Sequence, residues 1–153
     1  EALKSPVDIG FVGEIFRVNP QIIKTLTDAS FVPVISPIGT DENGETYNIN
    51  ADHAAVEIAI ALKAAKLVFM TDIDGVRQDA EKAETLLSRL TPAQIDSMIK
   101  NKSINGGMIP KVKSCARAIK SGVKSVHIIN GKIKHSLLLE IYTHDGIGTI
   151  IED

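Results

Sequence analysis

The hydrophobic residues of this chain follow two alternating patterns, short continuous apolar runs and longer stretches with helical spacing. The continuous runs are rich in β-branched residues and predict strands at 31–38, 67–71, 125–130 and 148–152, the first of them buried on both faces. The helical stretches predict helices at 19–30, 50–65, 91–101, 108–122 and 135–144. Strands that alternate with helices indicate an α/β fold, in which a mostly parallel sheet is covered by helices on both faces.

Polar residues at the ends of these stretches support the same elements. Asn19-Pro20 provides an N-cap and a first-turn proline, Asn50 is a candidate N-cap, and Thr91-Pro92 caps the helix that follows it. The turn signal DENG at 41–44 predicts a short hairpin after the first buried strand. The β-rich stretch at 7–18 is interpreted either as a hairpin or as an excursion from the main sheet.

Composition narrows the class of protein. With 153 residues and a mass of 16.5 kDa the chain has the size of one domain, and no linker, repeat or low-complexity tract divides it. Hydrophobic residues at 44% and charged residues at 24% exclude a disordered or fibrous protein. The single cysteine, Cys115, cannot form an internal disulfide or a cysteine-based zinc site, which favours a reducing intracellular compartment. No apolar run approaches the roughly 18 residues of a membrane span, and the first residues lack the pattern of a signal peptide.

Charge is distributed unevenly along the chain. Residues 97–139 contain nine lysines and arginines and no acidic residue, whereas the rest of the chain carries eight basic and 19 acidic side chains. Such a segment can place a positive surface beside a phosphate-bearing ligand, although lysines on solvated helix faces would give the same count. Because this segment has no aromatic residue and the whole chain has only 4% aromatic residues and no tryptophan, a platform for single-stranded nucleic acid is not expected.

Three polar or glycine-rich segments lie where open α/β sheets bind ligands, beyond the carboxyl ends of predicted strands. They are 47–52, 71–77 and 105–111. The phosphate fingerprints GxxxxGK[ST] and GxGxxG are absent. In NGGMIPK, two glycines allow close backbone approach, the helix start directs N–H groups outward and Lys111 adds a charge, so phosphate would suit this segment. Each segment also has an ordinary structural explanation, as a helix cap or an Asp-Gly turn.

The order and spacing of several motifs resemble one family. The motifs are VGEI, VNP, VPVISPIG, YNINAD, LVFMTDIDGV, NGGMIPKV and GIGTII. Together they resemble, over nearly the whole chain, the C-terminal nucleotide-binding half of the N-acetyl-L-glutamate kinases, within the amino acid kinase family. The resemblance implies a three-layer αβα sandwich and a C-terminal ATP-binding domain at 1–153. It also implies ATP and Mg²⁺ as cofactors for phosphorylation of the γ-carboxylate of N-acetyl-L-glutamate, the second step of arginine biosynthesis.

The resemblance carries roles onto the matching residues. Lys111 would stabilise the phosphoryl group in transit, Asp52 would organise the catalytic lysines, and Asn48 would contact acetylglutamate. ATP would lie across Asp72, Ile73, Asp74, Gly75, Val76, Arg77, Ser103, Ile104 and Asn105. A carboxylate acceptor is already ionised at neutral pH, so such a reaction needs alignment and charge neutralisation rather than a general base. No protein ligand set for Mg²⁺ is evident in the sequence.

The sequence differs from the family pattern in that it covers only the C-terminal half. The family's amino-terminal lobe carries a second catalytic lysine, a paired-glycine loop, an arginine for the substrate carboxylate and the main dimer surface, and those motifs do not occur in this sequence. We therefore expect this chain by itself to bind nucleotide at best and to be inactive as an enzyme. The full-length protein is expected to be a homo-oligomer.

The C-terminal residues resemble the arginine-feedback site of the arginine-sensitive family members. His127, Glu140 and Gly146 would line the pocket, and Glu140 would pair with the guanidinium of L-arginine. The ordinary alternative is a buried strand histidine and a helix glutamate without a ligand.

Two other functions stay open at this point. One is a sibling kinase of the same fold that acts on aspartate, glutamate or carbamate, which YNINAD and GGMIPKV disfavour. The other is a catalytically silent, arginine-binding regulatory module, which the joint presence of Asn48, Asp52 and Lys111 disfavours. The expected location is the bacterial cytoplasm, with a plastid as the alternative, and no nucleic acid or membrane partner is expected.

Overall fold

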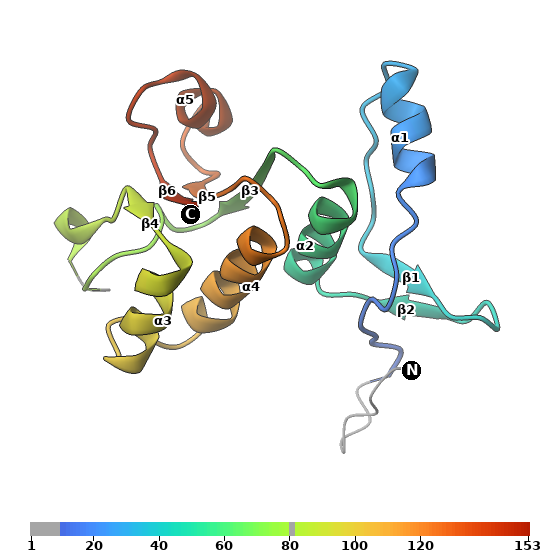
Figure 1. Ribbon diagram of the computed structural model, residues 1–153, viewed down its shortest axis with the longest axis horizontal. Coiled ribbons are helices and arrows are strands. Elements are labelled where there is room, and N and C mark those ends of the chain that lie inside the picture. The colour runs from blue at the N-terminus through green and yellow to red at the C-terminus, as the bar shows by residue number, and fades with distance from the viewer. Residues whose placement is uncertain (1–9, 80–81) are drawn as a thin grey trace. The chain divides into compact units, whose positions relative to one another are not determined.

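The computed structural model of the chain describes residues 10–79 and 82–153. The chain divides into two compact units, Glu1–Leu62 and Lys63–Asp153, here called the N-terminal unit and the C-terminal unit (Figure 1). The sequence predicts one domain, and it contains no linker at the boundary between these two units. The boundary falls directly at the end of helix α2 (Ala51–Leu62), where no glycine-rich or proline-rich stretch marks it.

The C-terminal unit is built on a four-stranded sheet with the strand order β3-β5-β6-β4. The strands are β3 (Lys66–Thr71), β4 (Arg89–Leu90), β5 (Ser125–Asn130) and β6 (Thr149–Ile151). The pairs β3–β5 and β4–β6 are parallel, and β5–β6 is antiparallel. The predicted α/β class with a mostly parallel sheet is therefore confirmed.

Helices cover both faces of this sheet. The helices of the C-terminal unit are α3 (Pro92–Lys100), α4 (Met108–Lys120) and α5 (Ser136–Tyr142), with a short 3₁₀ helix at Ala83–Thr85. Helices α3 and α4 lie on one side of the sheet and α5 lies on the other (Figure 1). The C-terminal unit thus has the three αβα layers that the sequence predicts.

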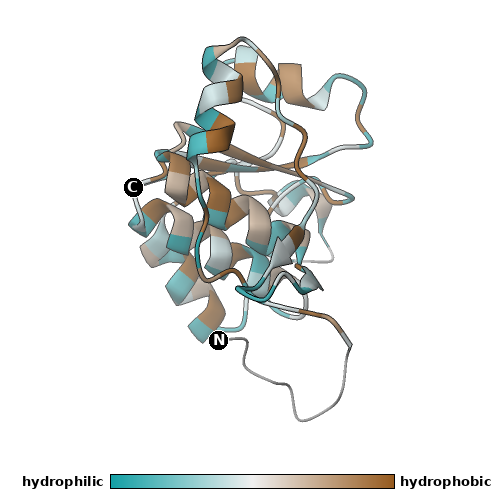
Figure 2. Cartoon of the chain, turned by 90° about the vertical axis from the view of Figure 1, so that its right-hand side faces the viewer, coloured by the Kyte–Doolittle hydropathy of each residue, from teal (hydrophilic) through white to brown (hydrophobic). Residues whose placement is uncertain are grey.

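The core of the C-terminal unit lies between α4 and the two central strands. Val126, Ile128 and Ile129 of β5 are fully buried, because helices cover this strand on both faces. From α4 come Val112 and Cys115, also fully buried. Figure 2 shows the corresponding hydrophobic colour on the strand ribbons.

Within residues 10–62, the N-terminal unit contains two helices and one hairpin. Besides α2, its elements are α1 (Gln21–Asp28), β1 (Ile38–Thr40) and β2 (Thr46–Asn48). Strands β1 and β2 pair antiparallel across the DENG turn, as predicted. The predicted hairpin or excursion at 7–18 lies partly outside the described residues; within 10–18 the structure has no strand pair, and Val12 forms a single parallel bridge to Asn48.

The prediction of a strand buried on both faces at 31–38 is wrong. Only Ile38 belongs to a strand, and the apolar side chains before it are open to solvent, with Val32 at 89% and Val34 at 97% exposure. A strand of that kind needs a hydrogen-bonded neighbour along its edge and packing on each face. Among the described residues, no strand pairs with 31–37.

The predicted helix caps form as hydrogen bonds. Asn19 Oδ1 accepts from the N–H of Gln21 at 3.0 Å, and Asn50 Oδ1 accepts from the N–H of His53 at 3.1 Å. Thr91 forms a reciprocal capping box with Gln94 at the start of α3. None of the helices in the described part of the chain has the length and apolar character to cross a bilayer.

Candidate functional site

The carboxyl ends of β3 and β5 meet at one edge of the C-terminal unit. The two strands are parallel and adjacent, and Thr71 at the end of β3 lies opposite Asn130 at the end of β5. The loop after β3 folds back on this edge, where Thr71 Oγ1 donates to the carbonyl of Ile73 at 2.9 Å. This edge is the place where open α/β sheets bind ligands.

A polar cluster holds the loop after β3 in place. Asp74 Oδ1 accepts a hydrogen bond from Asn130 Nδ2 at 2.8 Å, and its Oδ2 accepts one from Arg77 Nη2 at 3.0 Å. The hydrogen bond from Asn130, and then that from Arg77, hold the pKa of Asp74 below its ordinary value. Asp74 therefore stays ionised at neutral pH and fixes the loop, while Asp72 beside it is exposed.

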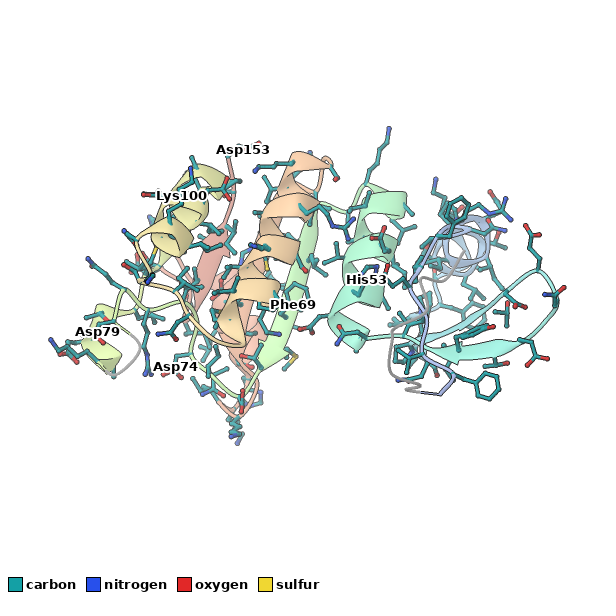
Figure 3. The ribbon with its side chains drawn as sticks, turned by 90° about the horizontal axis from the view of Figure 1, so that it is seen from below. His53, Phe69, Asp74, Asp79, Lys100 and Asp153 are labelled. Atoms are coloured by element: carbon teal, nitrogen blue, oxygen red, sulfur yellow. The ribbon has the colours of Figure 1, made fainter. Side chains whose placement is uncertain are left out.

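Helix α4 contributes a lysine near the same strand. Lys111 lies in the first turn of α4, and its Nζ is 5.2 Å from the centre of the Phe69 ring on β3. Phe69 is buried and Lys111 is half-buried. The face of the ring therefore attracts the ammonium group through a cation–π contact. Figure 3 shows Phe69 beside α4 and Asp74 on the loop beyond the strand.

The second predicted nucleotide segment lies between α3 and α4. The N–H of Ser103 donates to Asn101 Oδ1 at 3.1 Å, the side chain of Ile104 is buried, and Asn105 is exposed. A pocket of about 260 Å³ in the C-terminal unit is lined by Gln78, Leu87, Arg89, Leu90, Gln94, Ser97, Met98, Asn101 and Ser103. It joins Ser103 to Gln78, the residue that follows the first predicted segment.

The remaining two residues of the predicted catalytic site belong to the N-terminal unit. Asn48 ends β2, where its backbone bonds to Phe11 and Gly13 and its side chain is exposed. Asp52 lies in the first turn of α2 and is half-buried. Within the N-terminal unit, the side chain of Asn48 is open to a ligand and that of Asp52 is partly so.

The three residues of the predicted arginine site lie side by side. His127 on β5 donates from Nδ1 to Glu140 Oε1 on α5 at 2.6 Å, and Ser125 Oγ lies 3.1 Å from His127 Nε2. Gly146 has a φ of +65°, and a Cβ there would lie 2.7 Å from Glu140 Oε2, so the contact requires glycine.

Glu140 is a buried and internally satisfied carboxylate. It is 8% exposed, and its Oε2 accepts hydrogen bonds from the N–H groups of Ile147 at 2.8 Å and Gly148 at 3.1 Å. Burial raises the pKa of Glu140, but the bond from His127 and those two backbone bonds outweigh it and hold the pKa below the ordinary value. Oε1 accepts one hydrogen bond, from His127, and has a second lone pair with which a guanidinium could pair.

Asn130 and Thr149 were not predicted as site residues from the sequence. Asn130 could have been found, because it ends a predicted strand at the ligand-binding edge. Thr149 gives no such signal, since a threonine in a strand next to isoleucines is typical of any sheet. Its contacts to the loop after β3 are visible only in the fold.

No metal-binding cluster stands out in the site. Within residues 10–79 and 82–153, no group of three or more His, Cys, Asp or Glu side chains is placed to hold a metal ion. The acidic side chains at the sheet edge do not form a ligand set of their own, because both oxygens of Asp74 are engaged by Asn130 and Arg77.

Comparison with known sequences points to one family. A sequence profile described as the amino acid kinase family matches residues 2–130. An acetylglutamate kinase from Methanocaldococcus jannaschii is 54% identical over 145 residues, which is 95% of this chain and 48% of that protein. An acetylglutamate kinase from Symbiobacterium thermophilum is 50% identical over 145 residues, 95% of this chain and 50% of that protein. The chain thus spans about half the length of the curated relatives that it matches.

A solved structure shares the fold. The N-acetylglutamate synthase from Neisseria gonorrhoeae, crystallised with coenzyme A and L-arginine, is 28% identical to this chain with a TM-score of 0.88. The match covers 99% of this chain and 34% of the synthase chain.

Proposed function

The chain belongs to the amino acid kinase family, and from this premise we propose that it supplies the nucleotide lobe and part of the catalytic site of an acetylglutamate kinase. The reaction is transfer of the γ-phosphoryl group of ATP to the γ-carboxylate of N-acetyl-L-glutamate, a step of arginine biosynthesis. The observation that carries the proposal is the sheet edge where the loop Asp72–Arg77 is bonded to Asn130 at the ends of two parallel strands. Lys111 on α4 lies over Phe69 of the same strand, β3. The relatives named acetylglutamate kinase support the choice of substrate.

The nucleotide is proposed to lie along Asp72–Arg77 and Ser103–Asn105. The pocket between Gln78 and Ser103 is lined by several amide and hydroxyl side chains, which suit the hydrogen-bonding edges of a nucleoside. The glycine-rich turn before α4 and the helix start suit the phosphates.

Lys111 is the proposed catalytic cation of this chain. As an acceptor carboxylate oxygen bonds to the γ-phosphorus and the bond to the bridging oxygen of ADP breaks, negative charge gathers on the transferring group. The ammonium group of Lys111 would neutralise that charge. Because its contact with Phe69 already holds it in place, it would not need to reorganise as the reaction proceeds. Asp52 would orient the catalytic lysines and Asn48 the acetylglutamate.

Mg²⁺ would be held mainly by the phosphates of ATP, because the described residues offer no cluster of ligands for it. When bound, it would neutralise the phosphate charge. The activity belongs in the cytoplasm, or alternatively in a plastid, where a lone buried thiol such as Cys115 stays reduced. The complete enzyme is proposed to be a homo-oligomer, and this chain by itself to be without turnover.

Calorimetric titration with MgADP tests the nucleotide role. We expect saturable binding to the wild-type chain and about tenfold weaker binding to Asp72→Ala, since that variant removes a polar group from the loop. Asp96→Ala, which removes an equal charge from the exposed surface of α3, should change affinity by less than about twofold. An equal loss in both variants, or no binding to a folded wild-type chain, would contradict the proposal.

The role of Lys111 requires an enzyme with its full catalytic site. In a full-length protein that contains this chain, Lys111→Ala should lower kcat by about a hundredfold or more while the affinity for MgADP changes little. The matched control is Lys113→Ala, an exposed lysine two residues further along α4. Equal kcat values for the two variants would exclude Lys111 from catalysis.

A second candidate function is an arginine-binding regulatory module. The cluster of His127, Glu140 and Gly146 favours it, and the related synthase was crystallised with L-arginine. Arginine binding that Glu140→Gln abolishes, together with no response to MgADP, would favour this candidate over the kinase lobe.

A further inference from the structure

A buried hydroxyl joins the loop after β3 to the last strand of the sheet. Thr149, the first residue of β6, is fully buried. Its Oγ1 accepts a hydrogen bond from the N–H of Val76 at 2.8 Å and donates one to the carbonyl of Leu87 at 2.6 Å. Val76 and Leu87 also bond to each other, through the N–H of Leu87 at 2.8 Å. The Thr149 side chain therefore holds the connection between β3 and β4 at two points, Val76 and Leu87.

The backbone at Gly75 fits closely against this hydroxyl. A Cβ at Gly75 would lie 2.5 Å from Thr149 Oγ1 and 3.0 Å from the Thr149 nitrogen, at a φ of +152°. No side chain can be accommodated at such a separation. The path of the loop is therefore set by its contact with β6.

The residues before Thr149 are held by a different group. The N–H groups of Ile147 and Gly148 donate to Glu140 Oε2, whose other oxygen accepts from His127. The segment Ile147–Thr149 thus contacts Glu140 at one end and the loop after β3 at the other. All of these contacts are buried or partly buried, where small displacements are passed on rather than absorbed by solvent.

We propose that Thr149 is a positioning residue for the loop Asp72–Arg77, and that Ile147–Thr149 transmits a change at the Glu140–His127 pair to that loop. This inference rests on the proposed nucleotide role of the loop. A displacement or neutralisation of the Glu140 carboxylate would shift or release the two N–H groups that it holds. Thr149 passes this change to the N–H of Val76, so the position of the loop and its affinity for nucleotide respond to the state of Glu140.

Two variants of Thr149 test the positioning role. Thr149→Val removes the hydroxyl at nearly constant shape, and Thr149→Ser keeps it. Because a buried N–H loses its partner, Thr149→Val should speed hydrogen exchange of amides 74–78 by about tenfold and weaken MgADP binding by about tenfold. Thr149→Ser should stay within about twofold of wild type in both measurements. Unchanged exchange and affinity in Thr149→Val would overturn the proposal, as would an equal rise across β5, which would indicate a general loss of the sheet.

Glu140→Gln tests the transmission. We expect faster exchange at 146–149 and also at 74–78, since the charge-assisted bonds to Ile147 and Gly148 weaken. In the double variant with Thr149→Val, exchange at 74–78 should be no faster than in Thr149→Val alone, because both changes act on one connection. Faster exchange confined to amides 146–149, or additive increases at amides 74–78 in the double variant, would overturn the proposal that Ile147–Thr149 transmits the change.

The exchange and binding measurements separate this inference from the proposed function. If the wild-type chain gives no heat with MgADP, the nucleotide role fails. The exchange rates at 74–78 still decide whether Thr149 and Glu140 position the loop, because they are measured without ligand.

Discussion

Glu140 in the C-terminal unit and Asp41 in the N-terminal unit are carboxylates with the same number of partners in opposite surroundings. Asp41 accepts from the N–H groups of Asn43 and Glu45, both at 2.9 Å, and from the Tyr47 hydroxyl at 3.3 Å. Glu140 likewise accepts three hydrogen bonds, but it is 8% exposed, whereas Asp41 is open to solvent.

From this difference we infer that burial, rather than the number of hydrogen bonds, determines how much a carboxylate contributes to the stability of the fold. Water can replace the partners of an exposed carboxylate, but nothing replaces those of a buried one. The same contrast appears between one apolar segment of each unit. β5 is buried almost throughout, whereas the apolar residues at 31–35 are exposed.

Removal of the buried carboxylate should reduce stability more than any other change considered below. Glu140→Ala should lower the free energy of unfolding by about 3–5 kcal/mol, because it leaves His127 and two backbone N–H groups without their partner. Urea-induced unfolding measures the loss. Asp41→Ala is the matched control in the N-terminal unit and should change stability little. Similar losses for both variants would show that burial does not determine what these two carboxylates contribute to stability.

The second effect concerns apolar side chains. Ile128→Ala should destabilise the protein by about 2–5 kcal/mol, because Ile128 is fully buried and a cavity would form. Val34→Ala, in the exposed run, should stay within about 0.5 kcal/mol of wild type in the same unfolding experiment. A large loss for Val34→Ala would mean that the run is covered in solution.

The third effect is a pH dependence that Glu140 should contribute. Its pKa is lower in the folded protein than in the unfolded chain, so its stabilisation is complete above the ordinary value of 4.5 and is lost as the pH falls through the lower folded value. The stability difference between wild type and Glu140→Gln should therefore shrink on acidification below 4.5. A difference that is constant from pH 7 to the acid range would contradict this.

The smallest effect should be equal in the two units. Thr91→Ala at the start of α3 and Asn50→Ala at the start of α2 each remove a side chain that caps a helix. Each should cost about 1 kcal/mol in urea unfolding, because a cap acts locally and at the surface. A large inequality would show that something other than burial distinguishes the units.

The sequence predicted those elements that depend on local signals, and it failed where burial or strand pairing decides. The helices, the DENG hairpin and the strands β3 and β5 were predicted because capping residues, turn residues and periodicity act locally. The strand at 31–38 was wrong because apolar character says only that a segment can be buried, and no described strand pairs with it. The two-residue β4 is too short to leave a pattern.

The candidate site was predictable only in part. The loop Asp72–Arg77 and Lys111 have local signals, an Asp-Gly turn and a glycine-rich helix start. The bond between Asp74 and Asn130 joins residues 56 positions apart, and the contact of Thr149 with Val76 spans 73 positions. Such pairs depend on strand order, which periodicity does not specify.

Hydrogen exchange with and without MgADP, resolved along the chain, tests whether the C-terminal unit binds nucleotide. If the C-terminal unit is a nucleotide lobe, MgADP should protect amides within 72–78 and 103–111 and leave the hairpin at 38–48 unchanged. Protection confined to other segments, or none in a folded chain that L-arginine protects at 127–148, would contradict the claim and favour the regulatory module.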